Sequence, residues 1–298
     1  MHLNIHSLKN KVDGLEVFLD KERPDIVCLT EHHVGDQERK TVHFENFNEG
    51  SIYCRATKSK GGTAIYVNKG ITSREINVSD LAFEGDIELC VVKCDEVKVT
   101  VACVYRPPSG NYKVFFSNFE KLLERICRAD ATVFVCGDFN INLLEENDKQ
   151  VKRYGERLTR LLGLNNLNIA IDTPTRVAKG SATLIDNIFT SQNKDFFSAC
   201  NKDPGLSDHF SQFLYTQVHQ ETDCSKPGRI KHLYKRVHTD ESIILFKSFL
   251  QTYDWNSMFL EGNTIDEWYN GFVGKVKGFY EMAFPVKRLK QKKMPKEN

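Results

Sequence analysis

Long hydrophobic runs are missing from this sequence of 298 residues, although 40% of its residues are hydrophobic. No apolar stretch is long enough to span a bilayer, and the opening residues MHLNIHS lack the apolar centre of a signal peptide. We therefore expect neither membrane association nor secretion, and the expected location is the nucleus or the cytoplasm. The hydrophobic content still suffices for a substantial core, in one large domain or two ordinary ones.

An excess of charge is also missing, because 41 basic residues face 40 acidic ones. Any nucleic-acid binding must therefore come from local patches rather than from the net charge. The nine cysteines include Cys90 and Cys94, but no second pair and no pair of histidines complete a zinc-binding pattern. Cys28, Cys103 and Cys136 stand in apolar, strand-like runs, where a thiol behaves as a small hydrophobic group. We therefore expect reduced thiols in the core.

What the sequence does contain is an alternation of apolar, strand-like runs with amphipathic helical patterns up to about residue 218. Strands are predicted at residues 1–3, 25–31, 61–67 after an opening turn, 88–93, 99–105, 132–136, 183–190 and 210–218. Helices are predicted at residues 7–22, 112–128 and 151–162, the first capped by Ser7 and the last closed by Gly163. This alternation is typical of an α/β fold, in which ligands bind at a rim formed by strand ends.

The stretch ATVFVCGDFNIN at residues 131–142 is central to the functional interpretation. Its apolar run predicts a strand covered on both sides, which ends at Gly137. Asp138 and Asn140 follow two positions apart, so their side chains leave the same side of an extended backbone. A carboxylate and an amide placed together at a strand end are typical of an active-site corner, and an Asp/Asn turn cap is the alternative.

Other polar residues occupy comparable positions. Glu31 ends a buried strand, where it is either a surface charge or a metal ligand. Tyr105 and Arg106 lie at the mouth of a strand that Pro107 ends, where they either hold a phosphate or pack on the sheet. Asp186 stands among apolar neighbours, where a carboxylate is costly unless it has a partner. The remaining polar residues at predicted strand ends are Asn4, Asp208 and His209.

Together these stretches resemble the endonuclease/exonuclease/phosphatase superfamily. Within it they resemble the apurinic-type endonuclease domains of non-LTR retrotransposons of the jockey and CR1 kind. The matching motifs, in the family's order between Leu3 and His209, are LNIHSL, PDIVCLTE, GGTAIYV, VYRPP, VFVCGDFN, TPTR, LIDNIF and LSDH. Each motif is weak alone, whereas GDFN and SDH together with the upstream Glu31 form a specific signature.

The resemblance implies a four-layer α/β sandwich, two β-sheets packed face to face with helices outside, in a catalytic domain over residues 1–218. It also implies a Mg²⁺-dependent phosphodiesterase, with Mn²⁺ as a second usable metal. The implied substrate is double-stranded DNA, nicked on one strand to leave a 3′-hydroxyl that primes reverse transcription. We expect a monomeric fragment of a polyprotein that ends before a reverse transcriptase domain.

The resemblance also assigns metal-binding and DNA-binding roles. Glu31 would be the principal Mg²⁺ ligand, assisted by Asn4, and Asp208 would support the metal or the leaving oxygen. The first strand is cut to three residues, although it is central in the family, and His6 replaces an acid or amide of some relatives. The residues implied to touch a phosphate or the DNA backbone are Arg106, Thr175 and Ser207.

The remaining implied roles are catalytic. Asp138 would orient or deprotonate the attacking water, and Asn140 would hold that water and a phosphate oxygen. Tyr105 would contact the scissile phosphate, and His209 would donate to a non-bridging oxygen in the transition state. Asp186 would be the buried partner that orients and charges the imidazole.

The last part of the sequence has a different pattern. Residues 219–231 predict a linker, and residues 240–253 and 266–284 predict amphipathic helices that make residues 219–298 a helical connector. The closing run at residues 287–296 is basic, which indicates either a nuclear-localisation or nucleic-acid patch or a solvated, disordered end.

Two functions compete with a DNA-nicking enzyme. A decayed, inactive transposon relic is favoured by the clipped first strand and disfavoured by the intact acidic and histidine residues of the motifs. A phosphatase or phospholipase of the same superfamily is the other alternative. The YRPP and LIDNIF motifs favour the retroelement branch, and no membrane-binding stretch supports a lipid substrate.

Overall fold

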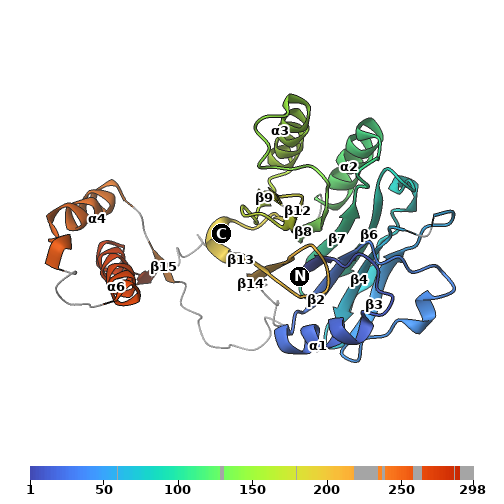
Figure 1. Cartoon of the computed structure of the whole chain (residues 1–298), viewed down its shortest axis with the longest axis horizontal. Coiled ribbons are helices and arrows are strands. Elements are labelled where there is room, and N and C mark those ends of the chain that lie inside the picture. Colours follow the sequence, from blue (N-terminus) through green and yellow to red (C-terminus); the bar gives the residue numbers. More distant parts are fainter. Residues whose placement is uncertain are drawn as a thin grey trace, which may run out of the picture. The chain divides into compact units, whose positions relative to one another are not determined.

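A computed structural model of the chain describes residues 1–58, 60–127, 131–178, 180–217, 234–236, 239–257, 264–284 and 286–288. The chain divides into two compact units, residues Met1–Thr222 and Asp223–Asn298 (Figure 1). No helix in the described part is long and apolar enough to cross a lipid bilayer.

The first sheet of the larger unit has six strands in the order β13–β14–β1–β2–β4–β3. Its strands are β1 (His2–Asn4), β2 (Ile26–Thr30), β3 (Phe47–Tyr53), β4 (Thr63–Asn68), β13 (Phe197–Lys202) and β14 (Ser211–Thr216). Strand β1 has only three residues, yet it pairs parallel with β2 and antiparallel with β14. The short first strand therefore lies in the interior of its sheet, as the resemblance implies.

The second sheet also has six strands, in the order β5–β6–β7–β8–β12–β9. Its strands are β5 (Arg74–Glu75), β6 (Glu88–Cys94), β7 (Val99–Tyr105), β8 (Thr132–Asp138), β9 (Asn168–Ile169) and β12 (Asp186–Thr190). Strand β8 pairs parallel with β7 and antiparallel with β12, so it is covered on both edges. The apolar run before Gly137 thus forms a central strand, as predicted, but the strand continues through Gly137 to Asp138 instead of ending at the glycine.

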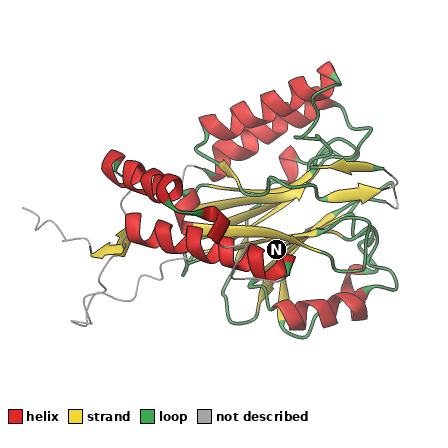
Figure 2. Cartoon of the chain, turned by 60° about the vertical axis from the view of Figure 1, so that its left-hand side comes forward, coloured by secondary structure: helices red, strands yellow, loops and turns green. Residues whose placement is uncertain are grey.

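Three helices cover the outer faces of the two sheets (Figures 1 and 2). They are α1 (Val12–Glu22), α2 (Tyr112–Ile126) and α3 (Lys149–Leu164). One hydrophobic cluster joins α1 to the first sheet, a second lies between the sheets, and a third joins the second sheet to α2 and α3. This arrangement confirms the predicted four-layer α/β sandwich.

The thiols predicted for the core are buried and free. Cys28 of the first sheet and Cys103 and Cys136 of the second belong to the cluster between the sheets. Cys90 and Cys94 belong to the same cluster, so this spaced pair packs as core residues.

The ends of two helices differ from the prediction. Helix α1 begins at Val12 rather than Ser7, because Ser7 has a φ of +79° and its hydroxyl accepts the amide of Lys9 outside the helix. Helix α3 begins earlier, at Lys149, where the Asp148 side chain accepts the amides of the first turn. Gly163 lies inside α3 rather than closing it.

Several short elements were not evident in the sequence pattern. The run at residues 183–190 divides between β11 and β12, because Asp186 is the first residue of β12. The additional strands are β3, β5, β9, β13 and the hairpin β10 (Arg176–Ala178) and β11 (Ser181–Thr183). Short 3₁₀ helices span Arg39–Thr41, Ser79–Leu81, Lys194–Phe196 and Trp255–Ser257.

The smaller unit contains two helices and a strand pair. Its elements are α4 (Asp240–Thr252), α6 (Ile265–Ala283), β15 (Tyr234–Arg236) and β16 (Val286–Arg288). Aromatic rings join the helices, with centroids 5.9 Å apart for Phe246 and Tyr280 and 5.5 Å apart for Phe249 and Phe279. The predicted linker at residues 219–231 and most of the basic run, residues 289–296, lie outside the described residues.

Candidate active site

Four neighbouring strands of the second sheet each place a polar side chain at the same level. The strand register sets Glu88 of β6, Tyr105 of β7, Asp138 of β8 and Asp186 of β12 side by side. All four are buried. Paired residues share one face of a sheet, and so do residues two positions apart on a strand. Cys90, Cys103 and Cys136 lie two positions from Glu88, Tyr105 and Asp138 and pack in the cluster between the sheets. The polar row therefore faces the first sheet. The row therefore meets the strand ends of the first sheet.

Asn4 connects the two sheets. Its side-chain Nδ2 donates to Glu31 Oε1 at 2.9 Å and to Asp138 Oδ2 at 2.8 Å, while its Oδ1 accepts the amide of His6 at 3.1 Å. The three-residue strand thus places Asn4 between the two carboxylates. In this arrangement the amide nitrogen of Asn4 faces both carboxylates and its oxygen faces the backbone of His6, and assistance at a metal stays a prediction.

Glu31 follows β2 with a φ of +52°, a conformation that few residues other than glycine adopt. Burial opposes ionisation of this side chain, but hydrogen bonds from His33, Asn4 and Tyr105 outweigh burial and lower the pKa of Glu31 to about 2. The His33 Nε2 atom lies 3.3 Å from Glu31 Oε2. Glu31 is therefore an ionised, partly buried carboxylate rather than a solvated surface charge.

Tyr105 presents its hydroxyl to the same carboxylate. Burial raises the pKa of Tyr105, and the negative charges of Glu31 and Asp138 raise it further. The hydroxyl therefore keeps its proton at neutral pH and remains a hydrogen-bond donor.

His209 and Asp186 form a buried pair. The His209 Nδ1 atom lies 2.9 Å from Asp186 Oδ2. Burial lowers the pKa of His209, but the hydrogen bond and charge of Asp186, with the charge of Asp138, raise it to about 9. The imidazole is thus charged at neutral pH. The pair explains why an acid begins a strand that is buried throughout.

Asp138 lies between these groups. Burial raises its pKa, and repulsion from Asp186 adds to this effect, so that the pKa reaches about 8 despite the favourable contacts with His209 and Asn4. Three carboxylates and one imidazolium therefore share this corner. A bound cation would relieve the repulsion that keeps a proton on Asp138.

The carboxylate oxygens of this corner fit a divalent cation. One oxygen each of Asp138 and Asp186 and one nitrogen of His209 lie within 4.8 Å of one another. Because both nitrogens of the charged imidazole carry protons, the two carboxylates are the ligand candidates of this group. Within the described part of the chain, Asp186 Oδ1 is buried without a hydrogen-bond partner. Carboxylate oxygens with a neighbouring ionised Glu31 suit a hard cation such as Mg²⁺ or Mn²⁺. The metal-binding residues expected from the sequence were Glu31, Asn4 and Asp208. Of these, only Glu31 lies as a carboxylate beside the group of Asp138, Asp186 and His209.

The family model described as "Endonuclease/Exonuclease/phosphatase family" matches residues 1–209. The chain belongs to this family. A comparison with curated proteins finds no match.

Several solved structures share the fold. The endonuclease domain of TRAS1, a telomere-specific non-LTR retrotransposon, is 15% identical, with a TM-score of 0.56, over 73% of this chain and 97% of that one. An AP endonuclease from Archaeoglobus fulgidus is 14% identical, with a TM-score of 0.58, over 73% and 98%. The 3′ phosphatase NExo from Neisseria is 12% identical, with a TM-score of 0.54, over 72% and 98%. The chain thus has the fold of nucleases and phosphatases.

Asn140 is the last residue of the GDFN motif and has a φ of +47°. Its backbone amide donates to Asp138 Oδ1 at 3.0 Å, and its side-chain Nδ2 donates to the carbonyl of Arg106 at 2.9 Å. Asp138 therefore caps a turn with one oxygen while the other faces Asn4. The turn-cap interpretation of the GDFN motif is therefore confirmed, and the active-site interpretation stays a prediction.

Arg106 does not have the exposed position that binding to phosphate requires. The residue is 1% exposed, and its guanidinium donates to the carbonyls of Phe139, Pro107, Gly110 and Asn140 at 2.9–3.2 Å. The guanidinium also lies 4.0 Å from the centre of the Tyr112 ring. Arg106 therefore supports the turn after Asp138 from inside the protein, and the expectation of a phosphate contact is corrected.

Thr175 requires a similar correction. The residue is fully buried, and its hydroxyl accepts the amides of Ile185 at 3.2 Å and Asp186 at 3.1 Å. It therefore fixes the backbone of Asp186 instead of touching DNA. Ser207 is half-buried, and its hydroxyl accepts the amide of His209 at 3.1 Å.

Asp208 is turned toward basic partners. Its carboxylate accepts Arg176 Nε at 2.8 Å and lies 3.7 Å from His6 Nδ1. The side chain is 38% exposed. The structure thus pairs Asp208 with Arg176 instead of grouping it with Glu31, which differs from the expected role at the metal.

Two residues beside the site were missed in the sequence. His33 contacts Glu31, and its only signal is its place two positions after that residue. Glu88 belongs to the buried polar row, and its signal is an acid at the start of the apolar run ELCVV.

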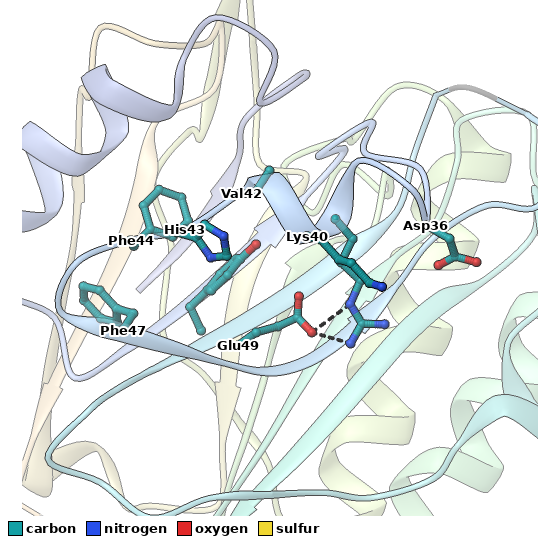
Figure 3. Close-up of a pocket in the computed structure, with 9 residues that line it drawn as sticks. Asp36, Lys40, Val42, His43, Phe44, Phe47 and Glu49 are labelled. Atoms are coloured by element: carbon teal, nitrogen blue, oxygen red, sulfur yellow. Dashed lines mark hydrogen bonds and ion pairs between the residues drawn. The ribbon is translucent and has the colours of Figure 1, made fainter.

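A separate pocket of about 610 Å³ lies beside the cluster that joins α1 to the first sheet (Figure 3). The rings of Phe44 and Tyr66 meet edge to face there, with centroids 4.9 Å apart, and Arg39 forms an ion pair with Glu49. The residues that line this pocket include none of the expected site residues. It is therefore not part of the candidate active site.

Proposed function

We propose that the chain is a divalent-metal-dependent phosphodiesterase that nicks one strand of double-stranded DNA. Mg²⁺ is the proposed cation, and Mn²⁺ can replace it. One observation carries the proposal: Asn4 joins Glu31 of one sheet to Asp138 of the other, next to the Asp186–His209 pair. An inactive relic is less consistent with acids and an imidazole that remain in mutual contact.

Glu31, Asp138 and Asp186 would hold the cation. When bound, the cation would polarise the phosphate and help to activate water. Without a cation, the raised pKa of about 8 keeps a proton on Asp138, whereas the positive charge of a bound cation would favour the carboxylate, which can then accept the proton of the attacking water. The water oxygen forms a bond to phosphorus while the bond from phosphorus to O3′ breaks. O3′ takes up a proton and becomes a 3′-hydroxyl, and the other product keeps a 5′-phosphate.

Two further side chains would act on the phosphate. His209 is charged at neutral pH, because the raised pKa of about 9 keeps its second proton, and it can donate to a non-bridging oxygen. The Tyr105 hydroxyl remains protonated and can donate to the same group. Both donors would stabilise the negative charge that develops on the phosphate oxygens in the transition state.

The YRPP and LIDNIF motifs and the fold of the TRAS1 endonuclease domain support a role in a non-LTR retrotransposon. The 3′-hydroxyl would then prime reverse transcription by a polymerase domain of a longer polyprotein. The chain would act as a monomer in the nucleus or the cytoplasm.

We expect the purified chain to convert supercoiled plasmid to open circles with Mg²⁺ or Mn²⁺, and not with EDTA. A DNA polymerase should extend the nicked product directly, because each nick carries a 3′-hydroxyl. Gel electrophoresis followed by primer extension measures both results. Release of phosphate from a 3′-phosphorylated oligonucleotide without nicking would indicate a phosphatase instead, and neither activity would indicate a relic.

A further inference from the structure

A buried ion pair lies next to the candidate active site. Glu88, the fourth member of the polar row, is fully buried, and the Arg55 side chain is only 9% exposed. Glu88 Oε1 accepts Arg55 Nε at 2.6 Å and Nη2 at 2.5 Å, whereas Oε2 accepts the amide of Gly62 at 2.6 Å. Oε1 also accepts the amide of Gly85 at 3.3 Å. The two carboxylate oxygens thus hold different partners.

Gly61 and Gly62 form a tight turn between the ion pair and the site. Their φ angles are +117° and +91°, which favour glycine. A Cβ atom at Gly61 would lie 2.3 Å from Arg55 Nε, and one at Gly62 would lie 2.3 Å from Nε2 of the buried His32. The turn is therefore enclosed by Arg55 on one side and by His32 on the other.

The same turn holds the backbone of the candidate metal ligand. The amide of Glu31 donates to the carbonyl of Gly62 at 2.9 Å, and the amide of His33 donates to the carbonyl of Gly61 at 2.9 Å. Glu31 has a positive φ, so its conformation persists only where its surroundings fix it. A continuous chain of hydrogen bonds thus runs from Glu88 through Gly62 to Glu31.

We propose that Arg55 and Glu88 are positioning residues for Glu31. The ion pair fixes the Gly61–Gly62 turn, and the turn fixes the backbone from which Glu31 and His33 reach the cation site. The alternative is that the pair only stabilises the fold. The two roles predict different results for substitution of the pair. If the pair positions Glu31, substitution weakens metal binding in protein that is still folded, whereas a pair that only stabilises the fold leaves the metal affinity of folded protein unchanged. The activity part of this inference rests on the proposed function.

The test is Glu88→Gln. The glutamine oxygen can accept from Gly62 or from Arg55 but not from both, because the amide nitrogen does not accept. We expect the Kd for Mn²⁺, measured by electron paramagnetic resonance without DNA, to rise by about tenfold or more. Half-maximal nicking should require proportionally more Mg²⁺, with kcat largely restored at saturating metal.

Val91→Ala is the matched control. Val91 lies on the same strand β6 but packs in the cluster beneath α2 and α3, so its truncation lowers Tm without touching the turn. Its Kd for Mn²⁺ should stay within about twofold of that of the wild type. Wild-type Mn²⁺ affinity in Glu88→Gln would overturn the proposal, and so would an equal rise in Kd for Val91→Ala.

A second variant covers the case in which Glu88→Gln does not fold. Arg55→Met with Glu88→Leu removes both charges and leaves no unpaired buried ion. It should fold and still bind Mn²⁺ about tenfold more weakly, because Gly62 loses its acceptor. Unchanged affinity would overturn the proposal. If the wild type binds Mn²⁺ but does not nick DNA, the proposed function fails while the affinity measurements still decide the role of the pair.

Discussion

The change His209→Ala is expected to lower the rate of plasmid nicking by about 100-fold to 1000-fold at pH 7.5. The imidazolium is held by Asp186 at 2.9 Å and is charged at this pH, because its pKa is raised to about 9. Alanine removes this charged donor from the corner where the transition state gains negative charge. The rate at saturating Mg²⁺, compared between variant and wild type, measures the effect.

His43→Ala is the matched control, because His43 is exposed and lines the separate pocket of Figure 3. It should nick at the wild-type rate. Asp186→Asn should lower the pKa of His209, since burial then acts without the opposing carboxylate. Its nicking rate relative to that of the wild type should therefore fall between pH 6 and pH 8, because the wild-type imidazole stays charged over this range. Substantial nicking by His209→Ala at pH 7.5 would rule out the proposed role of the imidazole.

The change Gly137→Ala is expected to destabilise the larger unit by about 3 kcal/mol or more. A Cβ atom at this position would lie 1.9 Å from the carbonyl oxygen of Val104, its partner in the parallel pair of β7 and β8. Backbone on both sides of the contact is fixed by pairing with neighbouring strands, so the clash cannot relax cheaply. Urea unfolding followed by circular dichroism measures the free energy.

Gly163→Ala is the control for the Gly137 experiment. Gly163 lies in α3, and a Cβ atom added there would meet no neighbouring atom of the described residues within 4 Å. Alanine should stabilise the helix there by about 0.5–1 kcal/mol, because it restricts the unfolded chain. A Gly137→Ala variant as stable as the wild type would contradict the close strand contact beside Asp138.

The central strands could be predicted because burial on both faces leaves an almost continuous apolar run, as at Thr132–Asp138. The edge strands could not. Strand β3 has the sequence FNEGSIY, in which a register shift between Glu49 and Ser51 breaks the alternation. Strand β13 also lies at a sheet edge, where alternate side chains remain exposed and the apolar signal is weak.

The sequence pattern placed the candidate site residues at or near strand ends. It did not indicate in which direction each side chain points. Arg106 looks like an exposed cation in sequence, yet it turns inward because carbonyls more than 30 positions away, at Phe139 and Asn140, need donors. The hydroxyl of Thr175 is likewise taken by the amides of Ile185 and Asp186. These partners come together only through folding, so no local pattern indicates them.

The most direct test of the cation site is an anomalous difference map from crystals of the chain grown with Mn²⁺. We expect one strong peak within coordination distance of Glu31 and of at least one of Asp138 and Asp186. A Mn²⁺ ion bound only elsewhere, for example between His6 and Asp208, with none among these carboxylates would contradict the proposed cation site.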